Sequence, residues 1–194
     1  MGENGSIPLP KIRSPSPQRV KEPELLVIET PKMQEPDIKR IEQELSKDVT
    51  LIDKKIKKKG DEYNGQVNKK TKKYHGKGIL TWKDGSNYEG YFKEGDHYGY
   101  GIKKWANGDI YEGNWERGYR HGIGKYYYAN GDKYEGEWRD GELHGLGQYW
   151  FKDGGMYQGS FAFGRKDGLG SLVFGDGVHM SGNWVQDEFH SNLK

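Results

Sequence analysis

Three of the six histidines stand at one repeated position, which raises the question of a metal site. His75, His121 and His144 are separated by multiples of 23 residues. Metal ligands must converge on one ion, whereas a unit of two strands would set neighbouring histidines about 10 Å apart. The chain also has no cysteine, which excludes thiolate ligands and disulfides. We therefore interpret these histidines as structural and expect no metal and no other cofactor.

The acidic residues show the same periodicity, with Glu89, Glu112 and Glu135 at equivalent positions. A catalytic carboxylate pair is a singular feature of a fold, so residues that are copied in successive units are better explained as framework. The Gly-x-Gly pairs do not open a helix, as a dinucleotide site requires. No P-loop, HExxH, EF-hand or Gly-x-Ser-x-Gly motif occurs. The sequence therefore predicts a protein that is not an enzyme.

A lysine-rich stretch lies between residues 54 and 73 and contains only two acidic residues, Asp61 and Glu62. Its nine lysines are Lys54, Lys55, Lys57, Lys58, Lys59, Lys69, Lys70, Lys72 and Lys73. Such a basic patch could contact anionic lipid weakly, at about 1 kcal/mol per lysine, or an acidic protein surface or RNA. It could equally be a solvated segment that keeps the first strand from pairing with another sheet. The whole chain has a net charge of only +2, so we expect no nucleic-acid partner.

The composition divides the chain near residue 60. All seven prolines lie between Pro8 and Pro36, whereas every aromatic residue follows residue 60. Residues 1–36 cannot bury enough apolar surface to offset the entropy of ordering, so we expect a disordered tail. Within it, Ser14 and Ser16 each precede a proline and are candidate sites for proline-directed kinases. No apolar run is long enough to span a bilayer and no secretory signal is present, so we expect a cytoplasmic protein.

Residues 37–59 are predicted to form one amphipathic helix. Its apolar residues recur at spacings of three and four, which places them on a single face. They are Ile38, Ile41, Leu45, Val49, Ile52 and Ile56. Asp37 is the expected N-cap, and Gly60 is expected to end the helix. The apolar stripe is narrow, so the helix needs a partner, either the domain that follows or another protein.

A 23-residue repeat governs residues 61–186. Tyr88, Tyr111, Tyr134 and Tyr157 mark the period, and Asp-Gly or Asn-Gly pairs and Gly-x-Gly pairs recur in the same phase. So many glycines disfavour helix, and the Asp-Gly and Asn-Gly pairs are strong hairpin signals. We therefore predict an all-β repeat fold, an elongated single-layer antiparallel β-meander of about eleven strands preceded by the helix and the tail. The units are expected at 63–87, 88–110, 111–133, 134–156 and 157–179, with a partial unit at 180–186 and a C-terminal tail at 187–194.

Strand alternation places large rings and bare glycines on the same face of this sheet. Tyr134, Gly136 and Trp138 share one face, so each ring can lie over a neighbouring glycine. Twist curls such a ribbon and turns one face into a groove. We predict that the central rings of the groove bind a partner, because aromatic side chains bury much area for little lost rotamer freedom. These rings are Trp105, Tyr111, Trp115, Tyr128, Tyr134 and Trp138.

The repeat resembles that of the MORN (membrane occupation and recognition nexus) family over about residues 61–186. The family motif is approximately Tyr-Glu-Gly-x-Trp, then a glycine, then His-Gly-x-Gly, an aromatic residue and Asp/Asn-Gly. It is matched by Tyr134-Glu135-Gly136-Glu137-Trp138, Gly141, His144-Gly145-Leu146-Gly147, Phe151 and Asp153-Gly154. The resemblance implies a scaffold without catalytic activity, with ciliary radial-spoke heads, cytoskeletal rings and membrane junctions among the family's roles.

From this resemblance we expect a protein partner that offers a helical or extended segment, in a ciliary axoneme or another cytoskeletal assembly. A second copy of the chain is another candidate partner. The alternatives are a peripheral membrane protein that binds anionic lipid through the basic patch, and a non-catalytic subunit of an enzyme complex.

Overall fold

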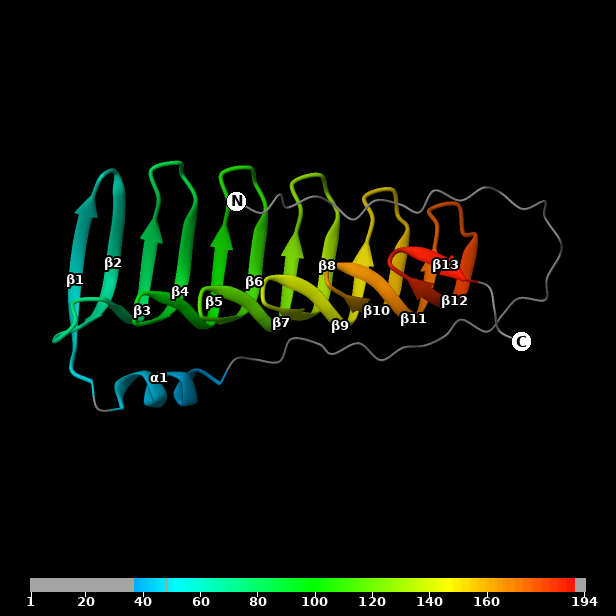
Figure 1. Ribbon diagram of the computed structural model, residues 1–194. Coiled ribbons are helices and arrows are strands. Elements are labelled where there is room, and N and C mark those ends of the chain that lie inside the picture. Colours follow the sequence, from blue (N-terminus) through cyan, green and yellow to red (C-terminus); the bar gives the residue numbers. More distant parts are fainter. Residues whose placement is uncertain (1–36, 48, 191–194) are drawn as a thin grey trace.

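In the part of the chain that the structure describes, the fold is one open antiparallel sheet of thirteen strands and one short helix, α1 (Ile38–Ser46). It was determined as a computed structural model, which describes residues 37–47 and 49–190. Each strand pairs only with its neighbours in the sequence, so the sheet is an elongated meander (Figure 1). The strands are β1 (Leu51–Lys58), β2 (Asp61–Asn68), β3 (Tyr74–Thr81), β4 (Asn87–Lys93), β5 (Asp96–Lys104), β6 (Ile110–Glu116), β7 (Tyr119–Tyr127), β8 (Lys133–Arg139), β9 (Glu142–Trp150), β10 (Met156–Ala162), β11 (Arg165–Val173), β12 (His179–Val185) and β13 (Glu188–His190). The predicted single-layer meander is therefore confirmed.

Two kinds of turn alternate along the array. The tight turns, such as Asp140-Gly141, have two residues with positive φ, 50° and 89°, which is the hairpin geometry that matches strand twist. The Asp-Gly and Asn-Gly pairs do turn the chain, but they lie in longer loops of five residues rather than in two-residue turns. In the loop between β5 and β6, Trp105 N–H donates to Asp109 O at 2.9 Å and Gly108 N–H donates to Trp105 O at 3.0 Å.

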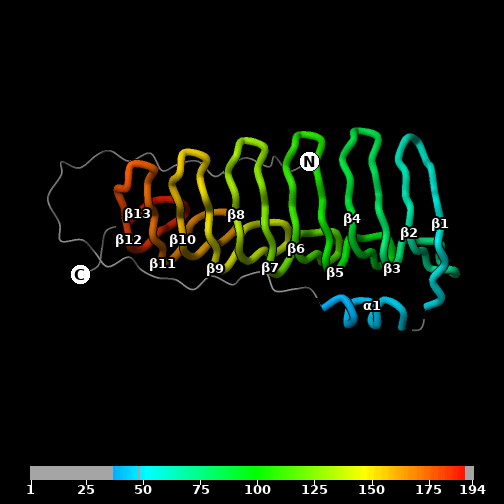
Figure 2. Tube along the Cα trace, turned by 180° about the vertical axis from the view of Figure 1, so that it is seen from behind, coloured from blue at the N-terminus to red at the C-terminus, as the bar shows by residue number. Residues whose placement is uncertain are grey.

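The sheet is bent because most hairpins carry an irregularity at the same place. The register shifts between Gly136 and Glu137 where β8 pairs with β9, and equivalent shifts occur in the preceding hairpins. Such bulges bend a strand and increase its twist. Figures 1 and 2 show the result: one half of each hairpin stands upright, and the other half curls beneath it to form a trough. We call the face inside the trough the inner face and the opposite one the outer face.

The core of the inner face is a ladder of tyrosines. Tyr63, Tyr88, Tyr111, Tyr134 and Tyr157 are between 0% and 2% exposed. Each hydroxyl donates to the carbonyl three residues later, as from Tyr134 to Glu137 O at 2.9 Å. Trp138 stands edge-on to Tyr134 at 5.3 Å between ring centroids, and its Nε1–H donates to Gly124 O at 3.2 Å. Because the tyrosine and tryptophan rings are both packed and hydrogen-bonded, the single layer has an ordered core without a second sheet.

The prediction of one helix over residues 37–59 is wrong beyond Ser46. Asp37 does cap α1, since its Oδ1 accepts from Arg40 N–H at 3.0 Å. Residues 51–58, however, form β1, in which Ile52 pairs with Val67 and Ile56 pairs with Tyr63. Val49 belongs to neither element. The chain extends here because Ile52 and Ile56 can then join the aromatic core of the sheet.

The number of strands also exceeds the predicted eleven, because the array gains a strand at each end. β1 adds the first one. The last is β13, which pairs Phe189 with Trp184 and lies in the segment predicted as a C-terminal tail. The predicted tail over residues 1–36, with Ser14 and Ser16, lies outside the described residues.

Candidate interaction surfaces

The structure places all six predicted groove residues on the inner face, but it divides them into two groups. Tyr111, Trp115, Tyr134 and Trp138 are between 0% and 5% exposed and belong to the core. Trp105 and Tyr128 are only half-buried and pack on that core. Trp82 has the equivalent place in the preceding unit. The aromatic surface that a partner can reach is therefore the row formed by Trp82, Trp105 and Tyr128, which we call the ring row.

Two basic side chains lie among these rings. Lys103 Nζ is 4.6 Å from the ring centroid of Trp82 and 5.2 Å from that of Trp105. The Arg120 guanidinium is 4.5 Å from the Trp138 ring and 5.8 Å from the Trp105 ring. Arg120 also donates to Gly141 O at 2.6 Å. Both cations thus lie on aromatic faces of the trough, a contact that electrostatics favours.

Two buried carboxylates of the inner face are fully engaged in structure. Asp109 Oδ2 accepts from the Tyr126 hydroxyl at 2.8 Å, and its Oδ1 accepts from Ala129 N–H at 2.8 Å. One unit later, Asp132 repeats the arrangement with the Tyr149 hydroxyl at 2.8 Å. Each aspartate thus joins its own loop to the loop of the next unit by hydrogen bonds, so we assign it a role in spacing the units.

His97 is a poor candidate for chemistry because its ring is largely buried. Its ring stacks on Tyr88 with centroids 3.8 Å apart. Burial and the nearby charge of Lys103 lower the pKa of His97 to about 3, so it stays neutral at physiological pH. Over residues 37–47 and 49–190, no three His, Asp or Glu side chains converge in a way that could hold a metal ion.

The outer face carries a second interaction surface, which α1 occupies. Ile41 and Leu45 are buried against Tyr91 of β4, with Ile38 and two tyrosines of β5 around them. A β-carbon at Gly99 would lie 3.1 Å from Ile41, so the glycine lets the helix approach closely. Figures 1 and 2 show α1 lying along the outside of the curled half of the sheet. The first three residues of the predicted apolar stripe therefore pack within this chain.

Polar contacts fix the helix in this position. The Tyr91 hydroxyl donates to Glu42 Oε1 at 2.9 Å. Glu44 Oε1 accepts from the Tyr98 hydroxyl at 2.6 Å and from Lys93 Nζ at 2.7 Å. The hydrogen bond from Lys93, and after it the one from Tyr98, holds the pKa of the Glu44 carboxyl below its usual value. The helix docking surface thus matches both the apolar and the acidic side chains of α1.

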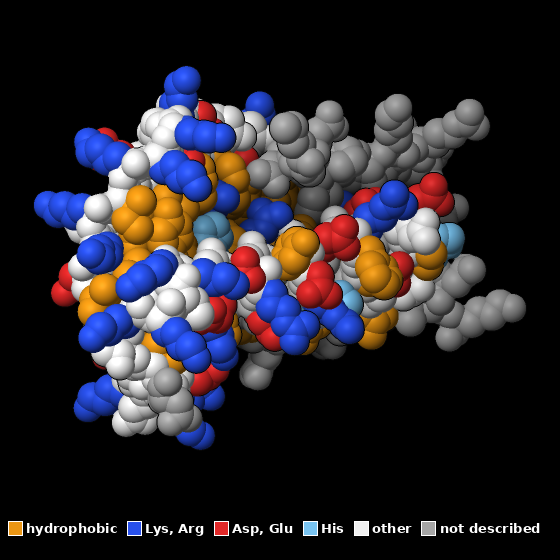
Figure 3. Space-filling view, turned by 60° about the vertical axis from the view of Figure 1, so that its left-hand side comes forward, with side chains coloured by type: hydrophobic (Ala, Val, Ile, Leu, Met, Phe, Trp, Pro, Cys, Tyr) orange, Lys and Arg blue, Asp and Glu red, His pale blue; other side chains and the backbone are white. Residues whose placement is uncertain are grey.

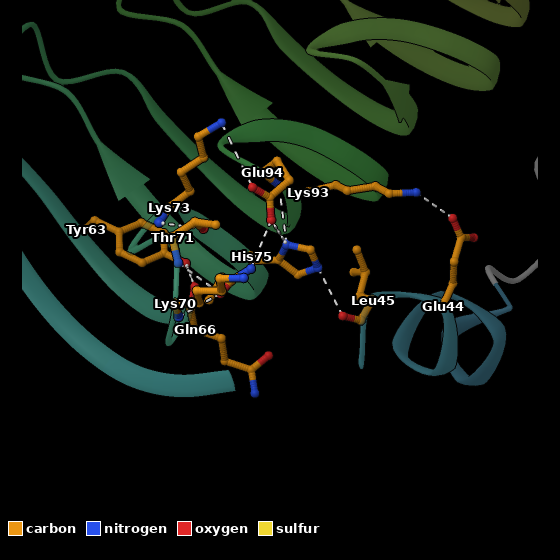
Figure 4. A network of polar contacts seen from close by, with 11 residues as sticks. Glu44, Leu45, Tyr63, Gln66, Lys70, Thr71, Lys73, His75, Lys93 and Glu94 are labelled. Atoms are coloured by element: carbon orange, nitrogen blue, oxygen red, sulfur yellow. Dashed lines mark hydrogen bonds and ion pairs between the residues drawn. The ribbon is translucent and has the colours of Figure 1, made fainter. Parts of the chain in front are cut away.

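The C-terminal end of α1 is held by His75 (Figure 4). His75 Nε2–H donates to Leu45 O at 3.0 Å, and Nδ1 lies 3.0 Å from Glu94 Oε1. Burial tends to raise the pKa of Glu94, but hydrogen bonds from Asn68 and His75 outweigh it and lower that pKa. A cavity of about 490 Å³ remains between α1 and the sheet, with Lys39 and Lys77 in its lining.

Sequence reasoning missed the helix docking surface, although a signal was present. Tyr91 and Tyr98 occupy positions that hold Asn114 and His121 in the next unit. A repeat that departs from its own pattern at neighbouring outer positions marks a place where something else is bound. Here that signal points to the surface under α1.

The predicted basic patch surrounds one end of the array. All nine lysines are exposed, on β1, in the turn after it and in the loop between β2 and β3. Figure 3 shows Lys and Arg side chains above and below a hydrophobic area at this end. Alternation along β1 directs Lys55 and Lys57 away from the face that carries Ile52 and Ile56. The lysines therefore cover the edge of the sheet on both faces instead of forming one flat patch.

These features define a class of protein: a single-layer array of β-hairpins built on a 23-residue unit, with a ladder of tyrosines over cross-strand glycines. The family model of the MORN repeat matches residues 72–87, 88–110, 111–133, 134–156 and 157–179. The chain therefore belongs to the MORN repeat family. A search of curated proteins gave no match.

Membership in this family indicates a repeat protein that takes part in protein or membrane interactions. In the part of the chain that the structure describes, no helix is long and apolar enough to cross a bilayer.

Proposed function

We propose that this protein is a scaffold without catalytic activity whose inner face binds an extended segment of a partner protein. The observation that carries this proposal is the ring row, in which Trp82, Trp105 and Tyr128 are only partly buried above a fully buried aromatic core. The rings beneath them are fixed by hydrogen bonds, so a partner would meet a rigid surface. Rigid aromatic surfaces favour binding because little conformational freedom is lost.

The spacing of the ring row fits an extended chain. One unit contains two strands, so equivalent rings are about 9.6 Å apart. Three residues of a polyproline-type extended chain span about 9.3 Å. Every third side chain of such a segment would therefore meet the next ring, in the way that aromatic-lined grooves bind such peptides.

Two adjacent tyrosines provide the test. Tyr128 belongs to the ring row, whereas Tyr127 points to the outer face and is 39% exposed. Crosslinking of the tagged full chain in cells, followed by mass spectrometry, would identify the partner. We expect Tyr128→Ala to remove it and Tyr127→Ala to retain it, with circular dichroism as the check on folding. Equal capture by both folded variants would show that the inner face is not the binding surface.

We propose further that the partner belongs to a cytoplasmic cytoskeletal assembly, with the ciliary axoneme and its radial spokes as the first place to test. The support is the family membership together with the elongated shape of the sheet. The test is to express the tagged chain in ciliated cells and to extract their axonemes with detergent. Recovery of the chain in the soluble fraction alone would contradict this placement.

Contact with an anionic membrane is a second candidate function, favoured by the nine exposed lysines at the β1 end. Such binding would be electrostatic, because these lysines surround a sheet edge and the described residues contain no membrane-inserting helix beside them. We expect co-sedimentation with anionic vesicles at low salt and none at high salt, where charges are screened. Salt-resistant binding to neutral vesicles would exclude this mode.

A further inference from the structure

Two cations flank one ring of the inner face. The Trp105 ring has Lys103 Nζ 5.2 Å from its centroid and the Arg120 guanidinium 5.8 Å from it. The Trp82 ring lies on the other side of Lys103, at 4.6 Å. We call the group of Trp82, Lys103, Trp105 and Arg120 the cationic notch.

Neither cation has an acidic partner within the described residues: no carboxylate oxygen lies within ion-pair distance of Lys103 or Arg120. The neighbouring units show what is missing. At the positions equivalent to Lys103, the two following units place a tyrosine that bonds to a loop aspartate, as Tyr126 does with Asp109. In the unit of Lys103 the loop residue is Ser86, whose own hydroxyl donates to Asp84.

The notch is consequently an unbalanced positive site in a half-buried place. Burial, and then the positive charge of Arg120, lower the pKa of Lys103, and the charge of Asp84 offsets part of this shift. A desolvated cation that forms no ion pair disfavours the free protein. An anion that entered the notch would relieve this cost and gain charge-assisted hydrogen bonds.

We propose that the cationic notch binds a carboxylate side chain of the partner segment, while apolar residues of that segment contact the ring row. This inference rests on the proposed function and specifies its partner: an extended peptide with an Asp or Glu among apolar residues. A peptide fits better than a flat anionic surface, because the cations lie among rings inside the trough. The repeating rings also require apolar groups at regular intervals along the same ligand.

A random peptide library selected on the full chain tests this inference. We expect the selected peptides to share an acidic residue with apolar residues three positions away on either side. Lys103→Met should weaken their binding about ten-fold, the effect of losing one charge-assisted hydrogen bond. Lys103→Arg should retain most of the peptide affinity. Added salt should lower the affinity of the parent chain.

Lys133 provides a matched control. Its Nζ lies 4.4 Å from the Trp150 ring centroid, but it has an acidic partner in Glu135 Oε2 at 3.3 Å. Lys133→Met should therefore leave peptide binding unchanged. The melting temperature gives a second readout: Lys103→Met should not lower it, because methionine can pack on the same two rings and the variant removes a desolvated charge that forms no ion pair within the described residues. A clear fall in the melting temperature of Lys103→Met would make Lys103 structural and overturn the inference.

The remaining outcomes separate the inference from the function on which it rests. Peptides that need Tyr128 but show no acidic preference overturn the carboxylate site alone. Peptides that bind Tyr128→Ala as well as the parent chain overturn the inner face as the binding surface. A library that yields no binder counts against both. Residues 24–29 of this chain also place Glu24 and Glu29 around four apolar residues, Leu25 to Ile28. Selected peptides that resemble this segment would support the carboxylate site but would contradict a separate protein as its occupant.

Discussion

The Tyr134 ring lies directly over Gly147 on the neighbouring strand, and a β-carbon added to Gly147 would be 2.6 Å from Cζ of that ring. Gly136 opposes Gly147 across the same pair of strands, so the ring covers two glycines at once. The arrangement recurs with Tyr111 over Gly124 and with Tyr157 over Gly170. The high glycine content is therefore a requirement of the aromatic core, because only a bare backbone leaves room for the rings.

Replacing Gly147 by alanine should destabilise the central units. The new methyl group would force Tyr134 out of its place, and overpacking of this kind costs about 2 kcal/mol. Gly155→Ala is the milder comparison: the nearest atom to its β-carbon is the Val173 carbonyl oxygen at 3.1 Å, which must move by only a few tenths of an ångström, and an equivalent position holds Asp132. Thermal unfolding followed by circular dichroism measures both. A melting temperature of Gly147→Ala equal to that of Gly155→Ala would refute this account of the core.

The buried ion pair near the C-terminal end should respond asymmetrically to mutation. Lys166 is 1% exposed, and its Nζ lies 3.1 Å from Asp187 Oδ1. Asp187→Ala leaves a buried lysine without its partner and should cost about 3 kcal/mol. Lys166→Met removes the buried charge itself and should be close to neutral. Urea unfolding monitored by Trp fluorescence compares the two, and equal losses of stability would contradict the asymmetry.

Loss of one apolar contact should release α1 without unfolding the sheet. Leu45 is 1% exposed between the helix and the outer face. Leu45→Ala should weaken docking by about 3 kcal/mol and increase amide exchange over residues 38–46. Gln43→Ala, at an exposed position of the same helix, should leave exchange unchanged. If exchange also increased throughout β6–β9, the helix would be part of the core and not a docked element.

Docking of α1 should also depend on acidity through Glu44. The pKa of Glu44 is lowered in the folded chain, chiefly by its hydrogen bonds with Lys93 and Tyr98. A carboxyl with a depressed folded pKa stabilises the fold fully above its unfolded value, near 4.5, and this contribution is lost as pH falls through the folded value. The effect should be small because the Glu44 side chain is 46% exposed.

Amide chemical shifts of Ile41 and Leu45 measured between neutral pH and pH 3 should therefore move toward those of a released helix. Glu44→Gln should remove the pH dependence that arises from this residue. An unchanged titration in Glu44→Gln would show that another group controls the docking.

The sequence predicted most of the sheet because its signals are local. Asp-Gly and Asn-Gly pairs turn the chain, and alternating tyrosine and glycine define one face. The helix prediction failed at Ile52 and Ile56 because a spacing of four keeps two residues on one face of a strand as well as of a helix. The missed signal was the Lys59-Gly60 pair. In the structure this pair forms a tight turn of the same kind as Glu94-Gly95, with φ values of 54° and 99°.

The binding surfaces were harder to predict for a different reason. Alternation correctly places Trp105 and Tyr111 on one face, but it cannot say that Tyr111 is 0% exposed while Trp105 remains accessible. That difference depends on packing between units: Tyr111 lies within β6, with the Trp115 and Trp138 rings edge-on to it, whereas Trp105 lies in the loop between β5 and β6. The docking of α1 depends on contacts between Glu42 and Tyr91, 49 residues apart, which no local pattern reveals.

The consecutive pairing of the strands also determines how the molecule would respond to mechanical load. Hydrogen bonds between strands run across them and hence along the long axis of the array. Tension between the two ends would act on the inter-strand interfaces in series, so that the weakest one yields first and the others hold. The β12–β13 interface, with three residue pairs, is the shortest of them. Stretching would then proceed in steps, one hairpin at a time. Each released hairpin would lengthen the molecule, while the aromatic trough of the remaining units would stay folded.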